Sequence, residues 1–183
     1  FGIEGELVYV NGVTKYKNGY TKNGLRNEIY SYGINDSLCL NPYWYAIEKL
    51  EYDINGNITK ASYFDADTLP CYYKDGIYSV LERVYEGNDL VMERFYNKNM
   101  ELQENSSNYA IAKFDYDNKH HITSYKYYDS KGNPCVRSEL YHSQSVLYTA
   151  NGQIAEYEYF DKRGNRCNSK DGYSKMQYKY DLK

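Results

Sequence analysis

The sequence predicts an all-β fold, an elongated and twisted array of antiparallel β-hairpin repeats with a period of 32 residues. Three observations support this prediction. First, shifting the chain by 32 residues superimposes Tyr45, Tyr109, Tyr141 and Tyr173, with Ile77 as the exception. Second, each period contains stretches in which apolar and polar residues alternate. Third, Gly-containing turns separate these stretches. A strict period of this length is typical of supersecondary units that stack on their neighbours.

The first strand of each repeat is predicted where side chains alternate, as in residues 109–116. Phe114 and Tyr116 fall on one face of this stretch, and period-two alternation with aromatic residues is a strand signal. The stretch from Ser79 to Val91 could be interpreted as a helix. Because the equivalent residues of the other repeats follow the strand pattern, we predict strands there too.

A turn follows the first strand and is clearest at Asn55-Gly56 and Asn151-Gly152. Asn-Gly supplies the positive φ that tight hairpin turns need. The second strand is predicted to begin at an aliphatic residue and to end in an aromatic pair, such as Tyr127-Tyr128. A polar corner and a short return segment then complete the repeat, so that each unit is one hairpin plus a connector.

All 183 residues are predicted to form a single repeat array. Terminal repeats are often irregular because they cap the array, and we expect such a cap in residues 1–44, of which 1–12 look like one more strand and turn. The remaining boundaries are repeats 45–76, 77–108, 109–140 and 141–172 and a partial repeat 173–183. Without an initiator Met and with an incomplete last repeat, the chain is expected to be a fragment of a longer protein. A closed barrel is the alternative geometry, and a parallel β-helix is less favoured because the hairpins reverse the chain.

The four cysteines share one position of the repeat. They are Cys39, Cys71, Cys135 and Cys167. If each repeat contributes a hairpin, these positions lie two strands apart, about 9–10 Å, whereas a disulfide needs Cα atoms closer than about 7 Å. We therefore expect small buried hydrophobic residues rather than disulfides.

The composition limits the function classes. The chain has 26 Tyr but 5 Phe and 1 Trp, and its mean hydropathy is −0.85, so most of its apolar surface is amphipathic. A net charge of −3 without a basic stripe argues against nucleic-acid binding. No apolar run approaches the roughly 20 residues that cross a bilayer. We expect no cofactor.

The blocks 51–57 and 127–135 carry a Tyr-Asp, two residues, Gly motif. This motif resembles the YD repeats of RHS-type proteins, and its aromatic hairpin is similar to the choline- and glucan-binding repeats of bacterial surface proteins. The resemblance covers residues 45–183 and implies a bacterial, surface- or toxin-associated, non-catalytic module, which favours a cell-surface or secreted location over a cytoplasmic one. Choline-binding repeats rely on Trp, whereas the only Trp here is Trp44, so no ligand residues are transferred.

The sequence contains two further candidate sites, a metal site and a Cys/His catalytic site, and we predict neither. His120 and His121, with Asp115, Asp117 and His142, could suggest a metal site. Adjacent histidines in a turn point apart, and a metal site needs convergent geometry, so we interpret them as solvated turn residues. A Cys/His enzyme is not expected either, because the cysteines recur as part of the repeat. We predict neither a metal site nor catalytic residues.

The aromatic pairs provide the functional hypothesis. One ring of each pair is predicted to line an exposed groove, which makes Tyr63, Tyr127 and Tyr159 candidates, with Trp44 at a repeat junction as a fourth. In the alternative, both faces pack, one of them against the connectors. We predict a non-catalytic module that displays Tyr-rich strand faces for protein binding or scaffolding. The alternatives are a cell-wall or glycan-binding array and an accessory repeat region of a larger protease or toxin.

Overall fold

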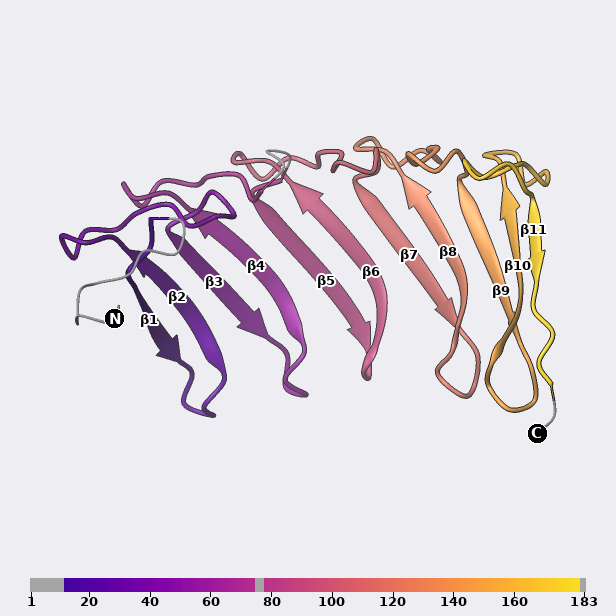
Figure 1. Cartoon of the computed structure of the whole chain (residues 1–183), viewed down its shortest axis with the longest axis horizontal. Coiled ribbons are helices and arrows are strands. Elements are labelled where there is room, and N and C mark those ends of the chain that lie inside the picture. The colour runs from indigo at the N-terminus through magenta and orange to yellow at the C-terminus, as the bar shows by residue number, and fades with distance from the viewer. Residues whose placement is uncertain (1–11, 75–77, 182–183) are drawn as a thin grey trace. The chain divides into compact units, whose positions relative to one another are not determined.

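The computed structural model describes residues 12–74 and 78–181, and every strand within them belongs to one antiparallel sheet (Figure 1). The strands follow one another in chain order, and the sheet is open rather than closed into a barrel. The described residues form no helix, and in particular none long and apolar enough to cross a membrane. The predicted all-β fold of successive antiparallel hairpins is confirmed.

Within the described residues, five hairpins and one further strand make up the sheet. The hairpins consist of β1 (Lys15–Tyr20) and β2 (Arg26–Tyr32), β3 (Ile47–Tyr52) and β4 (Ile58–Phe64), β5 (Val80–Glu86) and β6 (Asp89–Tyr96), β7 (Ile111–Tyr116) and β8 (Ile122–Tyr128), and β9 (Ser143–Tyr148) and β10 (Ile154–Phe160). The last strand is β11 (Lys175–Gln177). The chain divides into two compact units. Unit 1 comprises residues 1–83 and 95–101, and unit 2 comprises residues 84–94 and 102–183.

Pairing is longer within a hairpin than between hairpins. In unit 2, β7 and β8 pair along their whole length, from Ile111 with Tyr128 to Tyr116 with Ile122. By contrast, β8 and β9 share only three residue pairs, between the middle of β8 and the first three residues of β9. Toward their turns the β7–β8 and β9–β10 hairpins of unit 2 are therefore no longer paired with each other (Figure 1).

Tyrosine hydroxyls bridge neighbouring hairpins where the backbone ladder has ended. Tyr116 donates to the carbonyl of Leu90 at 2.9 Å, and Tyr148 donates to that of Ile122 at 2.9 Å. Unit 1 has the same bond from Tyr52 to the Arg26 carbonyl, at 2.6 Å. In each case the hydroxyl donates to a backbone carbonyl of the preceding hairpin, beyond the last residue pair between the two hairpins.

The hairpin turns have five residues rather than two. In the turn 53–57, the Gly56 N–H donates to the Asp53 carbonyl and the Asp53 N–H donates to the Asn57 carbonyl. Gly56 has a φ of 87°, and the ladder shifts register between Glu51 and Tyr52. This is a type I turn followed by a glycine bulge. The positive φ predicted for Asn-Gly is therefore present, but only at the glycine.

The same turn also forms the connectors, which the sequence pattern did not reveal. In the repeat that begins at β7, Asp117, Asp129 and Arg137 each start such a turn, and each accepts an N–H bond from the residue three positions later. The first of these turns closes the β7–β8 hairpin. The other two lie in the connector, where Tyr128 and Pro134 form an isolated bridge. The connector after β8 is thus a series of compact, hydrogen-bonded turns.

The β5–β6 hairpin is the exception. Its turn has two residues, and Gly87 at the first central position has a φ of 64°, which fits a type II′ turn. The helical interpretation of residues 79–91 is wrong, and the strands predicted from the repeat are confirmed. Comparison with the equivalent residues of the other repeats gave the correct prediction, because a hairpin at this position continues the sheet on both sides.

The cysteines hold neighbouring repeats together as hydrogen-bond donors. Cys71 and Cys135 direct their thiols at the carbonyls of Trp44 and Asn108, at 3.7 and 3.5 Å. All four thiols are free. Burial raises the pKa of Cys71 and of Cys135 to about 11. Only Cys71 is fully buried and the other three are half-buried, so the expectation of buried hydrophobic residues is correct for Cys71 alone.

The strand and turn predicted for residues 1–12 lie, except for Gly12, outside the described residues. The array is described from Val13 onward, which is buried at the position that Tyr45 occupies one repeat later.

Candidate functional site

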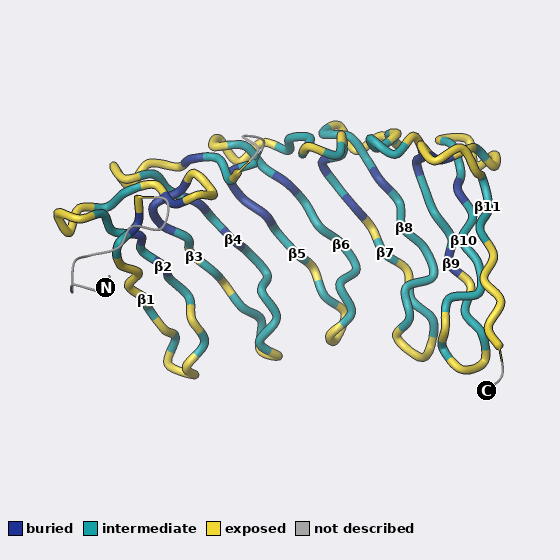
Figure 2. The backbone as a smooth tube through the Cα atoms, in the orientation of Figure 1, coloured by how far each residue is buried: buried dark blue, intermediate teal, exposed yellow. Residues whose placement is uncertain are grey.

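The three candidate tyrosines are part of the core. Tyr63, Tyr127 and Tyr159 are 5%, 4% and 8% exposed. Connector residues lie against these rings, with Tyr73 beside Tyr63 and Arg137 over Tyr127. Buried residues occur mainly on the strands toward their connector ends, whereas the hairpin turns and much of the described connectors are exposed (Figure 2). The expectation that these rings line an exposed groove is therefore wrong, and the alternative, packing against the connectors, is correct.

In unit 1 the core is a continuous row of rings. Ring centroids lie 4.9 Å apart for Tyr45 and Tyr63, 4.9 Å for Tyr63 and Tyr73, and 5.5 Å for Tyr73 and Tyr78. Phe95 also belongs to this row, with its ring centroid 5.0 Å from that of Tyr78. These are favourable distances for aromatic pairs. Burial raises the pKa of Tyr63 far above its ordinary value, so its hydroxyl stays neutral.

Unit 2 builds the same row around a cation. Tyr109 and Tyr127 lie 4.8 Å apart, and Tyr141 and Tyr159 also lie 4.8 Å apart. The Arg137 guanidinium stands over three of these rings, 4.8 Å from the Tyr127 centroid, 5.5 Å from Tyr141 and 5.9 Å from Tyr109. A cation within about 6 Å of a ring face is attracted to it.

Hydrogen bonds complete the arginine site. Arg137 Nη1 donates to the Tyr127 hydroxyl at 2.9 Å and to the Tyr141 hydroxyl at 3.4 Å. Its Nε lies against the Glu139 carboxylate in an ion pair without the alignment of a hydrogen bond. Arg137 was not among the candidates predicted from the sequence. A signal for it is nevertheless present, since it is the one cation at a repeat position held elsewhere by Asn41, Tyr73, Asn105 and Ser169.

Trp44 is the candidate that the structure leaves accessible. Its side chain is 67% exposed, and its backbone has a φ of 68°. It is the fourth residue of a connector turn, and its N–H donates to the Asn41 carbonyl. Gly172 has a φ of 89° at the equivalent position. A left-handed conformation suits glycine, whereas for other residues it costs about 1–2 kcal/mol.

Further apolar residues accompany Trp44 on the connector of unit 1. Leu40 and Tyr43 are both exposed, and we call Leu40, Tyr43 and Trp44 the connector patch. Tyr43 stacks on Tyr73 with 5.8 Å between centroids, and Lys74 Nζ lies 5.6 Å above the Tyr43 ring. No ring of the described residues packs against the Trp44 indole. Within the connector patch, the Tyr43 ring therefore packs against neighbouring side chains, whereas the Trp44 indole remains accessible.

The suspected metal ligands do not converge. His142 is buried with Nδ1 3.1 Å from the Cys135 carbonyl oxygen, far from the turn histidines in the fold. His120 contacts Asp89, and His121 contacts Asp117. The described part of the chain contains no group of three acidic, His or Cys side chains placed to hold a metal ion. His120 is exposed as expected, but His121 is half-buried.

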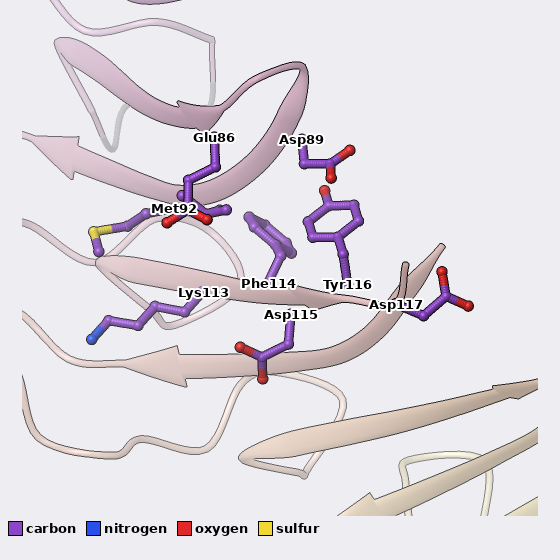
Figure 3. A pocket seen from close by; sticks show the side chains of 9 residues that line it. Glu86, Asp89, Met92, Lys113, Phe114, Asp115, Tyr116 and Asp117 are labelled. Carbon is purple, nitrogen blue, oxygen red and sulfur yellow. The ribbon is translucent and has the colours of Figure 1, made fainter. Parts of the chain in front are cut away.

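Two hollows lie in unit 2 where neighbouring hairpins separate. The larger, about 520 Å³, lies between β6 and β7 (Figure 3). Phe114 and Tyr116 project into it from one side of β7, and Glu86 and Asp89 face them from the preceding hairpin. The smaller, about 310 Å³, lies between the β8 turn and β9 and includes His121 and Tyr148.

Comparison with known proteins identifies no family. No family model matches the chain, and no curated protein matches it. Among solved structures, one chain of the "Crystal Structure of TcdB2-TccC3-Cdc42" is similar at 11% identity with a TM-score of 0.33. The match covers 78% of this chain but spans only 7% of the length of that one. The likeness is too distant to assign a function. The repeats agree with the resemblance to hairpin-repeat proteins as far as the antiparallel strand array.

Proposed function

We propose that this chain is a non-catalytic repeat module that binds a protein partner through the connector patch of unit 1, with Trp44 as the central contact. One observation carries the proposal. The only tryptophan of the chain is exposed and sits in a backbone conformation that glycine would adopt without strain.

The fold gains little from this residue. An indole contributes stability by burying its large apolar area, and here two thirds of the side chain stays in water. The left-handed backbone adds a cost. A residue that is unfavourable for the free chain is best explained by what it does in a complex, and tryptophan is among the residues most enriched at the centres of protein interfaces.

The surroundings of Trp44 fit a protein surface. Leu40, just before the turn, and Tyr43, within it, add exposed apolar area next to Trp44 in the sequence, and a compact apolar centre with polar surroundings is the usual anatomy of an interface. The buried strand tyrosines are not available to stack on a ligand. The proposed contact therefore moves from the strand faces, where the sequence had suggested it, to the connector.

The test separates folding from binding with one substitution and a matched control. Trp44→Gly should raise the unfolding free energy by about 1 kcal/mol, because glycine accepts the positive φ. Leu140→Gly changes the equivalent position of unit 2, where Leu140 is 58% exposed with a φ of 71°, and should stabilise the chain similarly. Urea denaturation of the whole chain measures both effects.

Binding is then compared among the same three proteins. Immobilised wild type, Trp44→Gly and Leu140→Gly are exposed to a lysate of the source organism, and a protein retained by the first and third but not by the second is purified. Calorimetry with that protein should show at least tenfold weaker binding to Trp44→Gly. Equal binding by all three chains would refute the proposal. If Trp44→Gly instead loses binding to a glycan array while it retains the same proteins as the wild type, the connector patch would be assigned to glycan binding.

A further inference from the structure

Two consecutive histidines connect three hairpin ends in unit 2. His120 Nδ1 lies 2.8 Å from Asp89 Oδ2, which joins the β7–β8 turn to the start of β6. The ring of His121 stacks on Tyr148 at the end of β9, with 4.6 Å between centroids. The two residues therefore reach in opposite directions, one to the preceding hairpin and the other to the following one.

These contacts lie where the backbone provides no connection. The ladder between β6 and β7 extends only from Met92 with Lys113 to Arg94 with Ile111. Between this ladder and the turns lies the hollow of Figure 3, which Tyr116 crosses with its bond to the Leu90 carbonyl. The contact of His120 with Asp89 adds a second link, at the outer end of the hollow.

The backbone at His120 has the same unusual conformation as Trp44, but for a different reason. His120 has a φ of 65°, where Gly56 and Gly152 have 87° and 77° in the equivalent turns. In this conformation its ring reaches Asp89. The charge-assisted contact offsets part of the strain, which an exposed side chain without a partner would not do.

The charged groups around the pair favour the imidazolium. Asp89 faces His120 from β6, and Asp117 and Lys119 belong to its own turn. Glu86 lies across the hollow at the end of β5. The hydrogen bond to Asp89 and then its negative charge raise the pKa of His120 above its ordinary value, with a smaller contribution from Asp117.

We propose that protonated His120 acts as a clasp between the ends of the β5–β6 and β7–β8 hairpins, and that the clasp opens as the pH rises, so that the hollow between β6 and β7 becomes more mobile. This inference concerns unit 2 and does not depend on a partner of the connector patch. Opening exposes the ring edges of Phe114 and Tyr116, which line the hollow.

The direction of the pH effect follows from the raised pKa of His120. Because the pKa of His120 is raised on folding, the clasp contributes its full stabilisation below the unfolded value near 6.5. It loses that contribution as the pH rises through the higher folded value. The device thus works in the range just above pH 6.5, where histidine is the natural switch among side chains.

The experiment follows each histidine by NMR titration of the full chain and measures amide exchange of the turns at pH 6 and pH 8, corrected for intrinsic rates. The His120 pKa should lie above 6.5, and the amides of residues 87–90 and 118–120 should exchange several-fold faster at the higher pH. Buried His142 serves as an internal reference within the same unit.

Two variants separate the clasp from a general effect of pH. Asp89→Asn keeps the side-chain shape but removes the charge, and it should bring the His120 pKa back to about 6.5 and abolish the pH dependence of exchange. His120→Asn tolerates the positive φ and should give fast exchange at both pH values. A His120 pKa that does not change in Asp89→Asn, or turns whose protection is the same at both pH values in the wild type, would overturn the inference.

Discussion

Unit 1 and unit 2 build the same aromatic row with different chemistry at its centre. One repeat position holds Tyr73 in unit 1 and Arg137 in unit 2. Tyr73 contacts the neighbouring rings by stacking, whereas Arg137 contacts them with its cation and donates to two of their hydroxyls. Tyrosine rings accept either a ring or a guanidinium, because a second ring packs on them in an offset or tilted arrangement and a guanidinium is attracted to their negative face.

Because of this difference, the two aromatic rows are stabilised by different interactions. The row in unit 1 is neutral, and its stability comes from buried ring area. The row in unit 2 contains an ion pair between Arg137 and Glu139 and two hydroxyls that depend on the guanidinium. A repeat protein can therefore keep its geometry while the physical basis of its core changes from one repeat to the next.

The largest expected effect tests the two centres directly. Arg137→Ala and Tyr73→Ala should each lower the unfolding free energy by about 3 kcal/mol. In unit 2 part of the loss comes from buried hydroxyls without their donor. Arg137→Tyr, which transfers the unit 1 residue to unit 2, should cost less than about 1.5 kcal/mol, because a ring of similar volume fills the site.

Urea denaturation of the whole chain measures the unfolding free energy of all three variants. The fluorescence of Trp44 and circular dichroism report the fraction unfolded. If Arg137→Tyr is as damaging as Arg137→Ala, the two centres are not interchangeable. The statement that a ring and a guanidinium can replace each other at the centre of the aromatic row would then be wrong.

A smaller effect is expected at the same position in the terminal regions of the two units. Asn41 is buried in unit 1, where its side-chain oxygen accepts the Tyr43 N–H at 2.8 Å. Ser169 is buried at the equivalent place in unit 2, and its Oγ has no hydrogen-bond partner in the described structure. Asn41→Ala should cost about 1–2 kcal/mol, whereas Ser169→Ala should be neutral or slightly stabilising.

The two alanine variants contrast a polar group that has hydrogen-bond partners with one that has none among the described residues, and thermal unfolding followed by circular dichroism compares them. A loss in Ser169→Ala as large as in Asn41→Ala would show that the Ser169 hydroxyl has a partner that the structure does not contain.

The smallest effect concerns a feature that the two units share. Tyr52→Phe in unit 1 and Tyr148→Phe in unit 2 each remove one hydroxyl bond to a carbonyl of the preceding hairpin. Each should cost about 1 kcal/mol, with faster amide exchange confined to the neighbouring hairpin ends. Unequal losses would sharpen the comparison by showing that one unit depends more on these bonds between hairpins.

The predictions for strands and those for surfaces had different outcomes, for one physical reason. The strand 111–116 and the second strand at 122–128 were predictable because alternation and turn residues act over a few neighbouring residues. The exposure of Tyr127 was not predictable in this way. It depends on Arg137 and on Tyr141, which the connector brings back over the sheet.

The periodic sequence alone determined the hairpin, its length and the common environment of equivalent residues, because each of these is a local property repeated along the chain. The tertiary structure decided which rings are covered, that a connector can consist of the same turn as the hairpins, and that Trp44 stays accessible whereas Tyr63, Tyr127 and Tyr159 do not. Burial is settled by which segments return to lie on one another, and in a single-layer sheet only the connectors can return.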